Sequence, residues 1–70
     1  MPKFVELTTR DGSFVYININ CIMQVNPCKG GGVEKTEVDL IGGPDDYRLV
    51  KETYHEVIAL IQHALEEGNK

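Results

Sequence analysis

Apolar and polar residues alternate in two segments near the start of the chain, residues 3–9 and 14–19. A two-residue period is that of a β-strand with one buried face. Between the two segments, Asp11-Gly12 supplies the positive φ values that a tight turn needs. The pattern therefore predicts that the first two strands form a β-hairpin.

The middle of the chain predicts three further strands. Residues 22–25 favour a third strand, which we expect to end at Asn26-Pro27 because proline cannot donate to a strand ladder. After a run of three glycines, residues 36–41 and 47–52 again contain strand-forming apolar residues. The Gly-Gly-Pro-Asp turn between these two segments predicts a second hairpin.

From Thr53 onward the apolar pattern changes to that of a helix. Thr53 and Glu56 have the spacing of a capping box, in which each side chain satisfies a backbone N–H at the start of the helix. Gly68 is suited to end the helix. The apolar residues that follow the cap recur at helical spacing and predict a buried face: Val57, Ile58, Ile61, Ala64 and Leu65.

Together these elements predict one α+β domain over residues 1–70. We expect a small antiparallel sheet of four to five strands, arranged as two hairpins and covered by one C-terminal amphipathic helix. A small half-open β-barrel capped by the helix is the alternative. The chain has 70 residues, of which 41% are hydrophobic and 26% charged, and this composition is typical of a single folded globular domain.

One helix can cover only one face of such a sheet. The residues that we expect to face the helix are Val5, Leu7, Val15, Ile17, Val38 and Leu40. Three aromatic side chains then lie together on the opposite face: Phe4, Phe14 and Tyr16. An exposed aromatic cluster is typical of a contact surface for a second copy or another protein, whereas a half-barrel would curl around the rings and bury them.

This cluster leads to the main functional hypothesis, a non-catalytic protein-interaction or assembly module. We expect it to self-associate or to bind a protein partner through the aromatic sheet face or through a free strand edge. The formal net charge of −4 and the scattered basic residues argue against general nucleic-acid binding. The alternative hypothesis is nonetheless a nucleic-acid-binding or regulatory domain, with Phe14 and Tyr16 as stacking platforms. Its candidate contacts are Lys3, Arg10, Arg48 and Lys51.

The sequence contains no pattern that indicates a catalytic, cofactor or metal site. Cys21 and Cys28 have no CxxC partner, and a structural zinc site needs four ligands. His55 and His63 are two helical turns apart, too far to share a metal. The Gly30–Gly32 run leads into a strand, whereas a phosphate-binding loop leads into a helix. We therefore expect neither an enzyme nor a cofactor or metal protein.

Location follows from the cysteines and from the hydropathy pattern. A small secreted scaffold normally carries four or more cysteines, so we expect Cys21 and Cys28 to be reduced thiols. No segment is long and apolar enough to cross a bilayer, and the first residues lack the features of a signal peptide. We expect a cytoplasmic protein that does not insert into membranes.

Two segments of the chain carry a family resemblance. The opening segment combines a strand, a turn glycine, the triplet Tyr-Ile-Asn and an isoleucine four residues after Asn18: FVELTTRDGSFVYININCIMQVNP. The closing segment combines a strand, a Lys-Glu-Thr cap and the terminal helix: YRLVKETYHEVIALI. Together they are similar to the small FlbD-type proteins associated with bacterial flagellar and swarming motility. The resemblance implies a bacterial or phage protein with no catalytic residue to carry over.

The chain departs from the FlbD-type pattern in two loops, KGGGVEK and IGGPDD, so the resemblance implies no shared binding surface there. The order of strands followed by a helix is also similar to the first half of the LytTR-type DNA-binding domain of response regulators. The second half of that domain, with its basic DNA-contacting elements, has no counterpart here. We therefore rank DNA binding behind protein contact.

Overall fold

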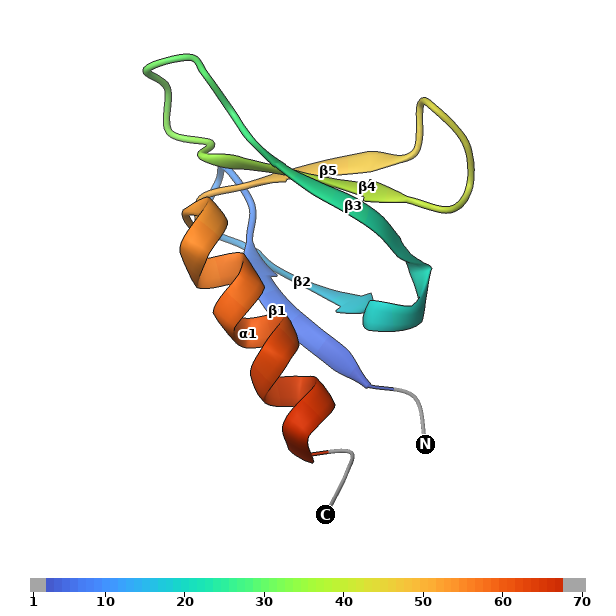
Figure 1. Cartoon of the computed structure of the whole chain (residues 1–70). Helices are drawn as coiled ribbons and strands as arrows, with labels where there is room; N and C mark the ends of the chain where they lie inside the picture. The colour runs from blue at the N-terminus through green and yellow to red at the C-terminus, as the bar shows by residue number, and fades with distance from the viewer. Residues whose placement is uncertain (1–2, 68–70) are drawn as a thin grey trace.

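The computed structural model describes residues 3–67 and confirms the predicted α+β class. Gly68, the residue predicted to end the helix, lies outside this range. A short 3-10 helix, η1 (Ile19–Cys21), separates the second and third strands. The five strands and the helix follow in this order (Figure 1): β1 (Phe4–Thr8), β2 (Phe14–Asn18), β3 (Ile22–Pro27), β4 (Thr36–Leu40), β5 (Tyr47–Val50) and α1 (Tyr54–Glu67).

The strands divide into two antiparallel sheets, β1-β2 and β3-β4-β5, and do not close into a barrel. Both predicted hairpins are confirmed, as β1-β2 and β4-β5. The sheets are connected where β1 and β5 end, because the Lys51 N–H donates to the Thr8 carbonyl at 2.8 Å. Within the second sheet, the Ile41 N–H donates to the Cys21 carbonyl at 2.9 Å, which extends the pairing of β3 with β4 beyond Ile22 and Leu40. This division of the strands was not predicted from the alternation pattern.

In the β1-β2 hairpin, two backbone bonds show which residue pairs are hydrogen-bonded across the ladder. At one end the Ile19 N–H donates to the Lys3 carbonyl at 3.0 Å, and at the other the Thr9 N–H donates to the Ser13 carbonyl at 2.8 Å. Bonded and non-bonded pairs alternate along an antiparallel ladder. The odd-numbered residues therefore bond across the hairpin, whereas the even-numbered residues of both strands direct their backbone N–H and C=O groups away from it.

The third strand ends at Pro27, as predicted, but Pro27 is itself the last residue of β3 and lies opposite Thr36. The Cys28 N–H donates to the Lys35 carbonyl at 2.8 Å, so Cys28 and Lys35 are a hydrogen-bonded pair. Because the two kinds of pair alternate, Pro27 and Thr36 are a non-hydrogen-bonded pair. An N–H at position 27 would thus point away from β4. Since β3 is an edge strand, proline there removes no ladder bond.

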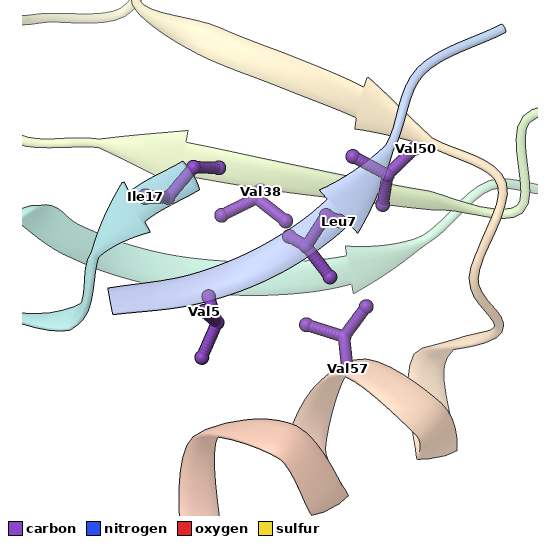
Figure 2. Packing of buried hydrophobic residues seen from close by; sticks show 6 residues of the cluster. All are labelled: Val5, Leu7, Ile17, Val38, Val50 and Val57. Atoms are coloured by element: carbon purple, nitrogen blue, oxygen red, sulfur yellow. The ribbon is translucent and has the colours of Figure 1, made fainter. Parts of the chain in front are cut away.

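The core lies between the two sheets and the helix (Figure 2). Helix α1 packs against β1 and β3. Four of the predicted inward residues are buried and two, Val15 and Leu40, are partly buried against them. The buried apolar residues are Val5, Leu7, Ile17, Val38, Val50 and Val57.

The start of α1 agrees with the predicted capping box. The Thr53 N–H donates to Glu56 Oε1 at 2.8 Å, and the Glu56 N–H donates to Thr53 Oγ1 at 3.2 Å. The predicted buried face of α1 is confirmed for Val57, which is fully buried. The prediction is wrong for Leu65, which is 52% exposed. Leu65 lies about 80° around the helix from Val57 at about 3.6 residues per turn, so it falls at the edge of the packed stripe. The described residues include no helix with the length and apolar character needed to cross a bilayer.

Candidate functional site

Phe4 of β1 and Phe14 and Tyr16 of β2 form what we call the aromatic face, the outer side of the β1-β2 hairpin. Their side chains are 53%, 61% and 62% exposed, respectively. The register places Tyr16 opposite Glu6 and Phe14 opposite Thr8, so these even-numbered residues share one face. The half-barrel arrangement that would bury the three rings within one protomer is therefore not formed.

Tyr16 and Glu6 form a cross-strand pair on the aromatic face. The Tyr16 hydroxyl donates to Glu6 Oε1 at 2.7 Å. This hydrogen bond, together with the negative charge of the carboxylate, raises the pKa of Tyr16 above its ordinary value. Glu6 thus places a charge beside the rings, and the phenol stays neutral over the physiological pH range.

Strand β2 presents a free edge beside the aromatic face. Within residues 3–67, the outward-facing backbone groups of Phe14 and Tyr16 have no hydrogen-bond partner. The strand, Phe-Val-Tyr-Ile-Asn, contains no charged residue, no proline and no bulge. Proteins normally protect exposed edges with such features, because an unpaired edge can accept another strand.

The outer edges of β1 and β3 differ from that of β2. On β1, the backbone of Thr8 bonds to Lys51 and to the Glu52 carboxylate. On β3, Pro27 lacks a donor and a register shift interrupts the strand between Ile22 and Gln24. Both strands also contact α1. Edge strand β5 carries the charged Arg48.

The four candidate nucleic-acid contacts do not gather at one place. Arg10 and Arg48 line the same shallow depression of about 660 Å³, beside the hairpin turn and β5. Asp11 and Glu34 line it too, so its charge is mixed. Lys3 lies at the other end of β1 from Arg10.

Arg48 is also engaged locally, since its Nη1 lies 3.2 Å from Asp46 Oδ1. Asp11 accepts a hydrogen bond from Thr9, and this bond contributes most to lowering the pKa of Asp11. Its carboxylate is therefore ionised at neutral pH and offsets the charge of neighbouring Arg10. Lys51 is exposed at the end of β5. No surface of concentrated positive charge results from these four residues.

The two cysteines are free and lie just before and just after β3. Burial, followed by the nearby charges of Glu37 and Glu34, raises the pKa of the Cys28 thiol. A raised pKa lowers the thiolate fraction and thereby the nucleophilicity of the group. Within residues 3–67, no three His, Cys, Asp or Glu side chains are grouped so that they could hold a metal ion.

A second apolar area was missed by the sequence analysis. Met23 and Ile41, which are 68% and 62% exposed, line a small depression of about 280 Å³ with Pro44. The sequence pattern places Met23 in a strand and Ile41 at the end of one, and it does not indicate that either side chain is exposed. Single exposed apolar residues are common on surfaces, and this area lacks the free strand edge that accompanies the aromatic face.

Searches of protein-family models, of curated proteins and of solved structures found no match to this chain. The resemblance to FlbD-type proteins therefore stays a prediction.

Proposed function

We propose that this chain is a non-catalytic protein-interaction module that self-associates through its β1-β2 hairpin. The observation that carries the proposal is the aromatic face, on which Phe4, Phe14 and Tyr16 are each more than half exposed. Aromatic side chains are enriched at the centres of protein interfaces, where their burial contributes much of the binding energy. A 70-residue chain buries a small core, so association also adds stability that the monomer lacks.

Sedimentation equilibrium or light scattering over a wide concentration range tests this proposal. We expect a concentration-dependent dimer. The variant Phe14→Gln should weaken association by at least about fivefold, because truncation of an aromatic anchor costs more than about 1 kcal/mol. Met23→Gln is the matched control, since it replaces an equally exposed apolar side chain in the second apolar area.

Two results would contradict the proposal. One is a strict monomer at the highest concentration that remains soluble. The other is a dimer that Met23→Gln weakens and Phe14→Gln does not, which would place the interface at the second apolar area. Circular dichroism of both variants distinguishes lost association from lost folding.

A nucleic-acid-binding role is the alternative proposal, and the proximity of Arg10 and Arg48 in one depression supports it. Arginine next to aromatic side chains is suited to bind single strands, and Tyr47 lines the same depression. Fluorescence anisotropy with single- and double-stranded DNA and RNA tests it. Binding should weaken as salt rises and should be lost in Arg10→Gln. Absence of binding at low salt rejects this alternative.

We also infer a cytoplasmic location. Both cysteines are free. In an oxidising compartment, a small domain with cysteines normally forms disulfides, so free thiols support a reducing compartment. Thiol labelling of protein recovered without reductant checks this inference, because oxidised cysteines would contradict it.

A further inference from the structure

We infer that the partner is a second copy of this chain, joined β2 to β2 as neighbouring antiparallel strands of one sheet that continues across the dimer. This inference rests on the proposed function and specifies both its partner and the surface used. It is carried by the free edge of β2, by the absence of charge on that strand and by the position of Glu6.

The edge of β2 is complementary to itself. A two-fold axis brings a strand beside its own copy in antiparallel orientation, so each donor faces an acceptor without any change in conformation. Full overlap of Phe14–Asn18 pairs Tyr16 with Tyr16 of the copy, and Phe14 with Asn18 of the copy. These are the residues whose backbone groups point outward, and the seam gains about six hydrogen bonds.

Charge favours β2 over the charged edge strand β5 as the place where a second copy binds. The chain has a net charge of −4, so two copies repel each other over most of their surfaces. Strand β2 contains no charged side chain and lets the copies approach without a like-charge contact at the seam. Edge strand β5, in contrast, would bring Arg48 close to its copy.

The position of Glu6 favours edge pairing over stacking of the aromatic faces of two copies. Glu6 lies on β1 opposite Tyr16, and stacked faces would enclose the carboxylates of both copies between the rings. Burying like charges without a cationic partner is strongly unfavourable. In the edge-paired dimer β1 is the outer strand, so Glu6 stays in solvent and keeps its hydrogen bond from Tyr16.

Edge pairing also explains how the rings contribute. The aromatic side chains of the two β2 strands lie on the same side of the joined sheet, and Tyr16 contacts its copy across the seam. Phe4 is one strand further from the axis, so it contributes least. In stacked faces, all three rings would contribute.

Symmetric cysteine cross-linking tests the seam, in a chain with Cys21→Ser and Cys28→Ser. In a bonded antiparallel pair, opposite Cα atoms lie about 5.5 Å apart, within the range of about 4.4–6.8 Å that a disulfide spans. Tyr16→Cys should therefore form a covalent dimer under mild oxidation. Phe14→Cys should not, because the two positions 14 lie about 14 Å apart at about 3.4 Å per residue. Gln62→Cys, on the exposed side of α1, is the control for random collision.

A second measurement does not depend on oxidation. Tyr16→Lys places two ammonium groups opposite each other and should weaken dimerisation by more than about tenfold, whereas Phe4→Lys should leave it within about threefold. Circular dichroism of each variant confirms that the monomer still folds.

The outcomes separate this inference from the proposed function. Selective cross-linking at position 16, with tolerance of Phe4→Lys, supports the β2 seam. A wild-type dimer that cross-links no better at position 16 than at 14 or 62, or that Phe4→Lys weakens as much as Tyr16→Lys, overturns the seam and leaves self-association intact. A wild-type chain that remains monomeric overturns both.

Discussion

The carboxylate of Glu52 accepts two hydrogen bonds from Thr8, one from its N–H at 2.9 Å and one from its hydroxyl at 2.7 Å. The backbone carbonyl of Glu52 also accepts from the hydroxyl of buried Thr36 at 2.6 Å. One residue thus connects β1 with β4, just before α1 begins. These bonds satisfy polar groups in partly buried positions, where an unpaired donor is costly.

Replacement of the Glu52 carboxylate should destabilise the fold. We expect Glu52→Ala to lower the free energy of unfolding by about 1.5–3 kcal/mol, the range for hydrogen bonds to charged groups. Urea denaturation followed by circular dichroism measures it. Glu66→Ala, at an exposed helix position, should change stability by less than about 0.5 kcal/mol. An equal effect of the two variants would show that the Thr8 bonds contribute nothing net.

Two leucines offer a matched test of the core. Leu7 is fully buried between the sheets and α1, whereas Leu65 is 52% exposed. We expect Leu7→Ala to cost about 2–5 kcal/mol through lost burial and the cavity left behind. Leu65→Ala should cost less than about 0.5 kcal/mol. Thermal and urea denaturation measure both, and a large loss in Leu65→Ala would show that the end of α1 packs against something.

The Tyr16–Glu6 pair predicts a pH effect with a defined sign. The phenol donates to Glu6 only when protonated, so its pKa is raised in the folded state. A raised pKa means that the bond stabilises the fold below the ordinary pKa of 10.0 and that this contribution is lost as pH rises through the folded-state value. The Tyr16 ring, followed by NMR, should titrate at lower pH in Glu6→Gln than in the wild type. An unchanged titration would contradict the pair.

Local signals allowed most of the fold to be predicted from the sequence. Alternation located the strands, Asp11-Gly12 located a turn in which Gly12 has a φ of 90°, and the Thr53 capping box located the start of the helix. The aromatic residues were identified as one face by the same alternation, and their side chains are exposed. Each of these features depends on residues close together in the sequence.

Features set by tertiary contacts could not be predicted in this way. The division into two sheets depends on which strand edges meet, and alternation carries no information about edges. Pro27 is tolerated because its strand is an edge strand, which became evident only from the pairing. The free edge of β2 and the exposure of Met23 and Ile41 are likewise properties of the assembled fold.

The bonds between Thr8 and Glu52 join positions 44 residues apart in the sequence. A connection of this span forms only after a long loop has closed, and such loop closure slows folding relative to that of helical bundles. Leu7 of the N-terminal hairpin is therefore buried only after the last third of the chain, which contains α1, has been made and has packed against β1. In the meantime two open strand edges are accessible to neighbouring molecules, so slow translation or truncation before α1 should favour aggregation.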